Sequence, residues 1–309
     1  MKRRLKIKPI IILIIIISVI IFGIIYLTKT INYHKTYEYK FIKIGYNKDE
    51  LSILEKLDNT SLDYLLTIPY NKNIDDIINE KYFMEKNLKK YINYLDKNSN
   101  LNDVVSIINV GANNNWYNNI KKTDIEKGHL LLTNKFYYLD NTYNSDDMVK
   151  VSKKYSYGEN QMLTNETYNA FIEMFNAAKS EDLTLIINSS YRSYEDQEQI
   201  YNELKSSKGE ESANKIAAKP GHSEHQTGMA IDIQTYGSTA NTFEEFEEFN
   251  WLKENAYKYG FILRYPKGKE YITGYEYESW HYRYVGTEVA TYIYENNITF
   301  DEYYAYFIN

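Results

Sequence analysis

Two short segments in the second half of the chain contain the residue types of a catalytic zinc site. They are SEHQTGMAID at positions 223–232 and ESWH at positions 278–281. Their residues include two histidines, an aspartate and a glutamate suited to such a site, namely His225, His281, Asp232 and Glu278. A catalytic zinc site needs three protein ligands, an open position for water, and a carboxylate that accepts the proton of that water. The two segments therefore predict a metallohydrolase.

Asp232 is the residue whose surroundings point most directly to a metal ligand. It lies in the run Met229–Ile233, which is otherwise apolar and strand-like. Burying a carboxylate in such a strand is costly unless the group is paired or bound to a metal. Gly228 permits the sharp change of direction between the segment that holds His225 and this strand. The alternative for Asp232, an ion pair with a lysine or the capping of a turn, stays open when this segment is taken alone.

His281 occupies the centre of a second strand-like run, Trp280–Tyr284. Taken alone, a histidine in a strand more often has a structural role than binds a metal. Glu278 lies three residues earlier, so its carboxylate can reach the same water without being a ligand. The chain has no H-E-x-x-H helix, but the predicted chemistry is that of other zinc peptidases. Zinc lowers the pKa of the water, Glu278 accepts its proton, and hydroxide attacks a carbonyl.

Arg192 follows an apolar, strand-like segment and precedes a predicted helix. At such a junction its guanidinium can stabilise a developing oxyanion or hold the carboxylate of a substrate. The alternative is a surface ion pair with Glu195 or Asp196, which would contribute little to stability.

A further pattern points to a different chemistry. Ser212 and Lys215 match the S-x-x-K pattern of serine penicillin-binding enzymes, in which the serine is the nucleophile. This short pattern is frequent by chance, and the chain lacks the K-T-G pattern that accompanies it in those enzymes. We therefore discount a serine mechanism.

The composition limits how a metal could be bound and which partners the chain could have. The 309 residues include no cysteine, so disulfides and a thiolate zinc site are excluded, and a metal must be held by His, Asp or Glu. The net charge is −6, but the first 29 residues contain six basic residues and no acid, which leaves −12 for the rest. Because nucleic-acid binding requires a basic face, this acidic remainder argues against a nucleic-acid partner.

The N-terminal segment predicts a membrane anchor. The run Ile10–Leu27 is apolar apart from Ser18, Gly23 and Tyr26, and its length is near the minimum for spanning the hydrocarbon core. Basic residues precede it, which predicts a cytoplasmic N-terminus and an extracytoplasmic remainder. The alternative is a cleaved signal peptide, but such peptides have a shorter apolar region followed by a small-residue cleavage site. We therefore expect a single-pass protein of the cell membrane.

The candidate site residues lie in a region where helices and strands alternate irregularly. Hydrophobic periodicity predicts helices over 167–178, 193–204 and 251–259, the last ended by Gly260. Strand-like sequence occurs at 130–135, 183–188, 261–265 and 280–285. This mixture predicts an α+β fold in which helices flank a small, mostly antiparallel sheet.

A short helical region precedes this part of the chain. Helices are predicted over 49–57, from an N-cap at Ser61 to a stop before Pro69, and over 81–95. This region contains no catalytic pattern, and we interpret it as a spacer, with a wall-binding module as the alternative. The predicted domains are 1–29, a cytoplasmic basic tip and the membrane anchor; 30–127, a stem and the small helical region; and 128–309, the catalytic domain.

Four blocks of the sequence, in the same order, resemble the zinc D-alanyl-D-alanine carboxypeptidases of the VanY type. They are YRSY with Gln197, PGHSEHQTG through Asp232, GFILRYP, and ESWH, and the likeness extends from about residue 130 to residue 286. The family implies an α+β fold shared with the zinc-binding domain of Hedgehog proteins. The family often has proline at the position of Ser279. Serine is less rigid than proline, so the position of Glu278 is less tightly fixed, but the reactive residues Glu278 and His281 are both present.

The resemblance also implies roles for individual residues. The zinc ligands would be His225, Asp232 and His281. The catalytic residues would be Glu278 as base and Arg192 as stabiliser of the transition state. Contacts with the substrate would come from Gln197 and Ser223. His222 would be a neighbour of the site and not a ligand.

The function implied by the resemblance is removal of the terminal D-alanine from peptidoglycan stem peptides or from their lipid-linked precursor. On the same scaffold, the chain could instead be an L,D-carboxypeptidase acting on the tetrapeptide, or an endopeptidase cutting within the stem or cross-bridge. A non-catalytic wall-binding module that keeps its zinc for stability is the alternative from a different class of function.

Overall fold

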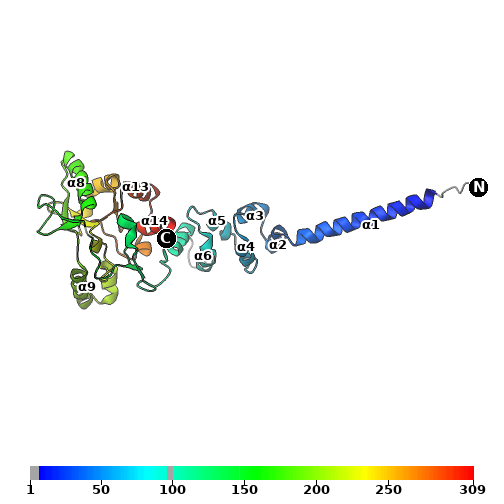
Figure 1. Cartoon of the computed structure of the whole chain (residues 1–309), viewed down its shortest axis with the longest axis horizontal. Helices are drawn as coiled ribbons and strands as arrows, with labels where there is room; N and C mark the ends of the chain where they lie inside the picture. Colours follow the sequence, from blue (N-terminus) through cyan, green and yellow to red (C-terminus); the bar gives the residue numbers. More distant parts are fainter. Residues whose placement is uncertain (1–6, 96–99, 146) are drawn as a thin grey trace, which may run out of the picture. The chain divides into compact units, whose positions relative to one another are not determined.

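The computed structural model of the chain describes residues 7–95, 100–145 and 147–309 (Figure 1). Contacts within the chain define two compact units, Met1–Val105 and Ser106–Asn309. The division falls inside helix α7 (Leu101–Val110). The domain limits expected from the sequence, 1–29, 30–127 and 128–309, stay predictions. The predicted basic tip, which includes residues 1–6, begins outside the described residues.

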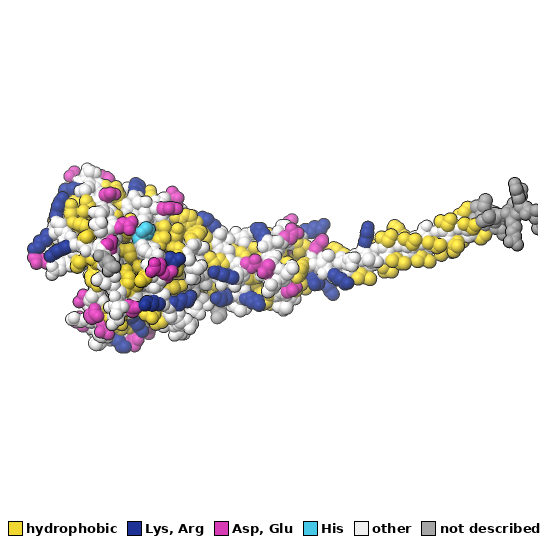
Figure 2. Space-filling model, viewed as in Figure 1, with side chains coloured by type: hydrophobic (Ala, Val, Ile, Leu, Met, Phe, Trp, Pro, Cys, Tyr) yellow, Lys and Arg dark blue, Asp and Glu magenta, His cyan; other side chains and the backbone are white. Residues whose placement is uncertain are grey.

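Helix α1 (Ile7–His34) contains the apolar N-terminal run. Residues Pro9–His34 are long and apolar enough to cross a membrane. At 1.5 Å per residue these 26 residues span about 39 Å, more than the roughly 30 Å of a hydrocarbon core. Apolar side chains cover the surface of this helix (Figure 2), and Phe22 is 74% exposed. A membrane anchor and a signal sequence both fit a helix of this kind.

The rest of the first unit is a cluster of short helices. They are α2 (Tyr37–Ile44), α3 (Lys48–Leu54), α4 (Asn59–Leu65), α5 (Asn73–Asn79), the 3-10 turn η1 (Glu85–Asn87) and α6 (Leu88–Leu95). Side chains from the buried faces of these helices form one apolar core, which includes Phe41, Leu54, Leu65 and Ile74.

The predicted helices of this region differ from the observed ones at their ends. Asp58, and not Ser61, caps α4, because the Asp58 carboxylate accepts a hydrogen bond from the Ser61 amide at 2.7 Å. The helix therefore begins earlier than predicted, although it does end before Pro69. The helix predicted over 49–57 ends at Leu54, and regular helix within 81–95 begins only at Leu88, after η1.

The second unit contains a four-stranded antiparallel sheet with the strand order β5-β6-β8-β7. The strands are β5 (Ile186–Ser189), β6 (Ala230–Gln234), β8 (His281–Tyr284) and β7 (Phe261–Leu263). Two further sheets have two strands each: β1 (Lys121–Lys122) with β2 (Tyr137–Tyr138), and β3 (Met148–Lys150) with β4 (Met162–Thr164). The predicted α+β fold with a small, mostly antiparallel sheet is confirmed.

The two faces of this sheet differ because side chains alternate along each strand. One face presents apolar side chains such as Ile231, Ile233 and Tyr282 to the main core. The intervening residues of the same strands, Asp232 and His281, are therefore on the opposite face. The sheet thus separates an apolar layer from a layer that carries the predicted site.

Helices complete both layers of the second unit. They are α8 (Asn165–Ser180), α9 (Tyr194–Lys208), α10 (Glu210–Ile216), α11 (Glu247–Asn255), α12 (Glu270–Thr273), α13 (Thr287–Asn296) and α14 (Phe300–Phe307). Helix α8 adds Phe171, Met174 and Phe175 to the main core, whereas α9 and α10 lie on the other side of the unit in Figure 1. The 3-10 turns are η2 (Ile125–Leu130), η3 (Glu224–Thr227), η4 (Phe243–Glu245) and η5 (Ala256–Tyr259).

The strand-like segment at 130–135 does not form a strand. The Asn134 side chain accepts hydrogen bonds from the amides of Phe136 and Tyr137, at 2.8 and 3.0 Å, and so stabilises a local turn. Lys135 is buried, and its ammonium group donates to the backbone carbonyls of Asn214 and Gly274. Side-chain hydrogen bonds therefore override the strand pattern of this segment.

Candidate active site

Two adjacent strands and one 3-10 turn bring the predicted metal ligands together. Asp232 on β6 is paired in register with His281 on β8. The turn η3 carries His225, and Gly228, at φ 70°, leads the chain from this turn toward β6. The ligand atoms of the three residues all lie within 4.8 Å of one another. His225 Nε2 is 3.4 Å and His281 Nδ1 is 3.0 Å from Asp232 Oδ1.

The second nitrogen of each imidazole contacts another group of the protein. His225 Nδ1 lies 2.6 Å from the carbonyl oxygen of Ser190. Because a carbonyl oxygen only accepts, this nitrogen carries a proton. His281 Nε2 lies 3.4 Å from Glu224 Oε2, a contact in which the ring nitrogen donates to the carboxylate. Contacts of this kind are typical of metal-binding histidines, because they fix which nitrogen is left to face the metal.

The surroundings of His225 fit a cation between the three groups. Burial lowers the pKa of His225, against the opposing effect of Asp232, so its ring is neutral at pH 7. With the proton on Nδ1, the Nε2 lone pair faces the Asp232 oxygen 3.4 Å away. Two acceptors that face each other in this way are stabilised by a positive ion between them. Two imidazole nitrogens and one carboxylate oxygen are a ligand set of catalytic zinc sites, so the residues present fit zinc.

His281 and Asp232 have shifted pKa values of opposite sign. Burial lowers the pKa of His281, but its hydrogen bonds with Asp232 and Glu224 outweigh burial and raise the pKa to about 9. Burial raises the pKa of Asp232, but the two histidines outweigh it and lower the pKa well below its usual range. Asp232 is therefore an ionised carboxylate at any physiological pH.

Glu278 lies beside these groups. Its Oε2 is 3.8 Å from His281 Nδ1, and its backbone amide donates to the Tyr265 carbonyl at 3.1 Å. Burial and the negative charge of Asp232 raise the pKa of Glu278 to about 7, although His281 and Arg192 act in the opposite direction. A carboxyl group with a pKa near neutrality is suited to accept and return a proton.

Arg192 lies between β5 and α9 with its guanidinium in the candidate site. Its Nη1 donates to Gln197 Oε1 at 2.7 Å, and its Nη2 donates to Ser189 Oγ at 3.2 Å. The acids that could have paired with it are directed elsewhere: Asp196 closes a capping box with Ser193, and Glu195 is exposed. The sequence-based alternative of a surface ion pair is therefore not observed.

A cleft of about 220 Å³ joins these groups. Its polar lining includes Arg192, Gln197, Ser223 and Glu278 together with the three candidate ligands. Its lining also includes apolar residues of α9, α10 and the segment that follows, namely Ile200, Leu204, Ile216, Ala217 and Ala218. The Gln197 amide is already engaged, because Oε1 accepts from Arg192 and Nε2 donates to the Ala218 carbonyl. Substrate contacts by Gln197 and Ser223 stay predictions.

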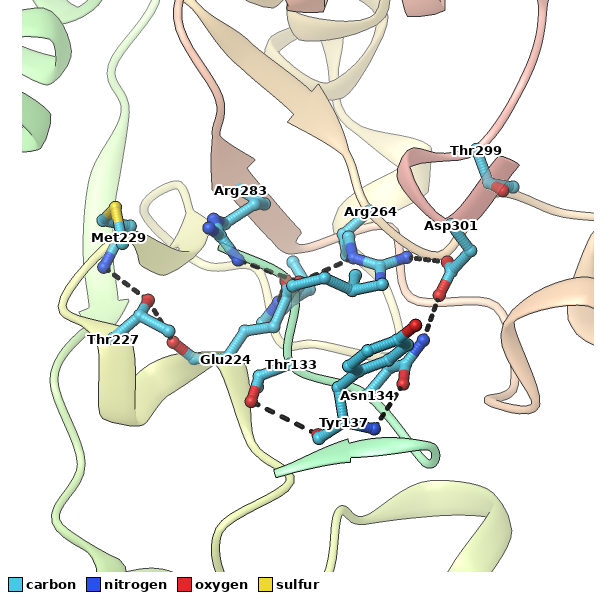
Figure 3. Close-up of polar contacts among 12 residues, drawn as sticks. Thr133, Asn134, Tyr137, Glu224, Thr227, Met229, Arg264, Arg283, Thr299 and Asp301 are labelled. Carbon is cyan, nitrogen blue, oxygen red and sulfur yellow. Dashed lines mark hydrogen bonds and ion pairs between the residues drawn. The ribbon is translucent and has the colours of Figure 1, made fainter. Parts of the chain in front are cut away.

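A buried network of ion pairs surrounds Glu224 (Figure 3), the residue that contacts the candidate ligand His281. Glu224 Oε1 accepts from Arg264 Nε at 2.8 Å and from Arg283 Nη1 at 3.1 Å. Arg264 Nη1 donates to Asp301 Oδ2 at 2.6 Å, and Asn134 Nδ2 donates to Asp301 Oδ1 at 2.7 Å. The side chains of Glu224, Arg264 and Arg283 are 0% exposed. Arg264 and Arg283 outweigh the effect of burial on Glu224 and lower its pKa below the usual range.

No pattern in the sequence predicted a role for the members of this network. The signal that points to them is a guanidinium inside a strand-like run, as in FILRY for Arg264 and HYRY for Arg283. A buried guanidinium requires an anionic partner, and Glu224, in the histidine-rich block, was an available one. Only the paired strands show that both arginines reach the same carboxylate.

Among the described residues, the remaining histidines and the S-x-x-K serine do not belong to the cluster of candidate ligands. His222 is buried, with Nδ1 2.7 Å from the Asn134 carbonyl, and it is not part of the ligand cluster. His129 contacts Glu166 at 3.5 Å, and His34 belongs to α1. Ser212 is exposed on α10, which agrees with discounting a serine mechanism.

Comparison with known sequences connects this site with a family. A family model described as VanY, D-alanyl-D-alanine carboxypeptidase, matches residues 160–287. The putative carboxypeptidase YodJ of Bacillus subtilis (strain 168) is 44% identical over 204 residues, which are 61% of this chain and 74% of the relative. A D-alanyl-D-alanine carboxypeptidase of Enterococcus faecium is 34% identical over 240 residues, 75% of this chain and 74% of that protein.

Solved structures of carboxypeptidases also resemble this chain. The LdcB LD-carboxypeptidase superposes with a TM-score of 0.58 at 40% identity, over 61% of this chain and 91% of that one. A mutant of the vancomycin resistance D,D-pentapeptidase VanY in complex with Zn(II) superposes with a TM-score of 0.50 at 34% identity, over 57% of this chain and 98% of that one. The chain therefore has the fold of these peptidases.

Proposed function

Because this chain belongs to the VanY-type family of D-alanyl-D-alanine carboxypeptidases, we propose that it is a zinc-dependent carboxypeptidase that removes the C-terminal D-alanine from peptidoglycan stem peptides. The observation that carries this proposal is the convergence of His225, Asp232 and His281 within 4.8 Å, beside the Glu278 carboxylate. The comparisons support it, because a relative that covers three quarters of the chain is a D-alanyl-D-alanine carboxypeptidase.

The candidate ligands and Glu278 have different roles in the proposed reaction. His225, Asp232 and His281 would hold the zinc ion, which when bound polarises the scissile carbonyl and makes water more acidic. Glu278 accepts a proton from the attacking water and delivers it to the departing amine of D-alanine. A C–O bond forms as the peptide C–N bond breaks, so the products are free D-alanine and a peptide shortened by one residue.

Arg192 acts on the charge that develops at the carbonyl oxygen. Its guanidinium is held by Gln197 and Ser189, so its orientation is fixed before substrate binds. A fixed cation facing the developing oxyanion stabilises the transition state more than the ground state. Ser223 lines the same cleft and is the candidate for a hydrogen bond to the substrate.

An L,D-carboxypeptidase is the second candidate function, because the chain is 40% identical to an LD-carboxypeptidase of known structure. The two activities differ in the residue that precedes the scissile bond, so they act on different stem peptides. A pentapeptide ending in D-Ala-D-Ala and the tetrapeptide derived from it therefore distinguish them.

The test is mass spectrometry of both peptides after incubation with the zinc-loaded full chain in detergent. We expect loss of one D-alanine from the pentapeptide and a much slower change in the tetrapeptide. Loss from the tetrapeptide alone would assign the L,D activity instead. A zinc-loaded, folded protein that shortens neither peptide would contradict the carboxypeptidase proposal.

Glu278→Ala distinguishes an enzyme from a wall-binding module that keeps zinc for stability. An enzyme loses turnover but retains zinc, whereas a binding module keeps its affinity for peptidoglycan and has no turnover to lose. Glu276→Ala is the matched control, because Glu276 is an exposed acid two residues away. Glu276→Ala should leave turnover unchanged.

We place the catalytic unit outside the cell membrane, held there by α1. The length and apolar surface of this helix support an anchor, and a cell-wall substrate supports an extracytoplasmic site. The partners would then be the membrane itself and the stem peptide of the wall or of its lipid-linked precursor. The acidic remainder of the chain offers no support for a nucleic-acid partner.

A further inference from the structure

Glu224 is adjacent in sequence to one candidate ligand, His225, but its side chain contacts another. Its Oε2 lies 3.4 Å from His281 Nε2, across 57 residues of sequence. The contact exists because η3 packs against β6, the strand that pairs with β8. Glu224 therefore faces His281 from the side opposite to Asp232, which contacts the other ring nitrogen.

Glu224 itself is not placed to bind the metal. Its Oε1 accepts from both Arg264 and Arg283, and its Oε2 contacts His281. It lies outside the cluster of ligand atoms formed by the three candidate ligands among the described residues. Both of its oxygens are thus engaged by donors, and its side-chain contact with the candidate ligands is the one to His281.

The position of the Glu224 carboxylate is fixed by a chain of buried charges (Figure 3). Arg264 follows β7, and it bridges Glu224 to Asp301 in the first turn of α14. Arg283 on β8 adds a second guanidinium, which is held by the backbone carbonyls of His129 and Leu131. The Glu224 carboxylate on η3 is therefore held by Arg283 on β8 and by Arg264, and α14 restrains Arg264 through Asp301.

Tyr265 supplies a separate restraint on the same imidazole. Its ring stacks on His281 with centroids 5.0 Å apart and an interplanar angle of 28°. Stacking fixes the plane of the imidazole but does not determine which nitrogen faces Asp232. Without a metal both ring nitrogens face a carboxylate, Asp232 at 3.0 Å and Glu224 at 3.4 Å. A metal between Nδ1 and Asp232 can replace only the Nδ1 proton, so the Glu224 carboxylate is the group that keeps the remaining proton on Nε2.

We propose that Glu224 is the positioning residue for His281. It keeps the proton on Nε2 and directs the Nδ1 lone pair to the metal, while Arg264 and Asp301 hold the Glu224 carboxylate. The inference rests on the zinc site proposed above and adds to it the group that makes His281 a ligand through Nδ1.

The first test leaves Glu224 and its partners unchanged. Nitrogen-15 NMR of the zinc-loaded full chain in detergent, labelled at histidine, reports which ring nitrogen carries the proton. The signal of His281 is identified by its loss in His281→Asn. We expect the proton on Nε2 and the metal on Nδ1. A proton on Nδ1 of His281 in the zinc-loaded protein would overturn the proposal.

Glu224→Gln is the direct test of the carboxylate. The two arginines require an acceptor at the Oε1 position, so the amide nitrogen of the glutamine faces His281 Nε2. That donor favours the ring form with its proton on Nδ1, which leaves Nδ1 without a lone pair for zinc. We expect zinc affinity to fall by about 10- to 100-fold in the folded variant. A folded Glu224→Gln protein with unchanged zinc affinity would overturn the proposal.

Asp301→Asn tests the same series of buried charges at the residue farthest from His281. It replaces Glu224→Gln as the test if that variant does not fold. The matched control is Glu302→Gln, because Glu302 is an equally buried acid of the same helix that pairs with Lys269 and not with Arg264. We expect zinc affinity to fall several-fold in Asp301→Asn and to stay unchanged in Glu302→Gln. Equal zinc affinity in both variants and the wild type would contradict the role of Asp301.

These outcomes separate the inference from the proposed function. Wild-type protein that binds no zinc would refute both. Wild-type protein that binds zinc and releases D-alanine, beside folded variants that bind zinc equally well, would refute only the role of Glu224.

Discussion

The two candidate histidines differ in charge because their second nitrogens contact different groups. His225 faces the neutral carbonyl of Ser190, and burial lowers its pKa. His281 lies between two carboxylates, Asp232 and Glu224, which outweigh burial and raise its pKa to about 9. One ring is therefore ready to bind a metal at neutral pH, whereas the other must first lose a proton.

This difference predicts how zinc affinity depends on pH. Below pH 9 zinc must displace a proton from His281, so affinity should rise by up to about tenfold per pH unit and level off near pH 9. Competition with a chromophoric chelator at several pH values measures this dependence. Zinc affinity that is constant between pH 7 and pH 9 would contradict the assignment of His281 as a ligand.

The raised pKa of Glu278 predicts a second pH dependence, that of turnover. The carboxyl must be ionised to accept a proton, and burial raises its pKa to about 7. Turnover should therefore fall as the pH drops below about 7, and bound zinc, being positive, shifts this limb to lower pH. The check is kcat/KM against pH with zinc saturating at every point. A profile without an acid limb between pH 4 and pH 8 would exclude Glu278 as the base.

Glu278→Gln tests the same residue without a large change in shape. The amide cannot accept a proton, so kcat should fall by about 10²- to 10⁴-fold while zinc stays bound. Steady-state kinetics with zinc content measured on the same sample is the check, and Glu276→Gln is the exposed control. Retention of more than about a tenth of wild-type turnover by the zinc-loaded variant would refute the assigned role.

At the scale of elements, the site depends on the pairing of β6 with β8. The register Asp232↔His281 places an acid and an imidazole opposite each other on one face, while Ile231 and Tyr282 face the core. A slip of β6 or of β8 by one residue would direct the ligand on that strand into the apolar layer. The apolar core under the sheet therefore also sets the geometry of the ligands.

Close backbone packing before η3 predicts that adding a side chain at Gly221 lowers the stability of the fold. This residue has φ 82°, and a Cβ there would lie 2.5 Å from the Leu139 carbonyl oxygen. Gly237 has nearly the same φ, 81°, but open space around it. Gly221→Ala should lower the free energy of unfolding by about 1–3 kcal/mol more than Gly237→Ala. Denaturant unfolding of both variants measures the difference, and equal losses would contradict the crowding at Gly221.

Much of the site was predictable from local sequence, because ligand types, Gly228 and the apolar runs around Asp232 and His281 are short-range signals. The buried ion-pair network was not, because it depends on strand pairing that joins residues 40 and 59 positions apart, Glu224 to Arg264 and to Arg283. The segment at 130–135 was predicted as strand-like because hydrophobic periodicity does not reveal hydrogen bonds made by side chains. Here Lys135 donates to the carbonyl of Asn214, which is distant in sequence, and Asn134 accepts from the amide of Phe136.

At the scale of the whole molecule, α1 and the catalytic unit differ in the kind of surface that they expose. The helix exposes apolar side chains along its length, whereas the second unit contains buried ion pairs in a layer beside its apolar core. Burial of the α1 side chains in hydrocarbon would remove that apolar surface from water.

This predicts that the full chain stays with membranes after alkaline washing. Mass spectrometry of the washed fraction should find peptides from residues 7–34 joined to the rest of the chain. Release of the catalytic unit into the soluble fraction, with a new N-terminus after residue 27, would show instead that the helix is a cleaved signal sequence.

Titration of zinc into chelator-stripped full chain, with D-alanine release from a pentapeptide ending in D-Ala-D-Ala as the readout, tests the zinc carboxypeptidase most directly. We expect no release at first, a linear rise with added zinc, and saturation at one zinc per chain. Release by the stripped protein, or saturation with zinc without release of D-alanine, would contradict the proposed function.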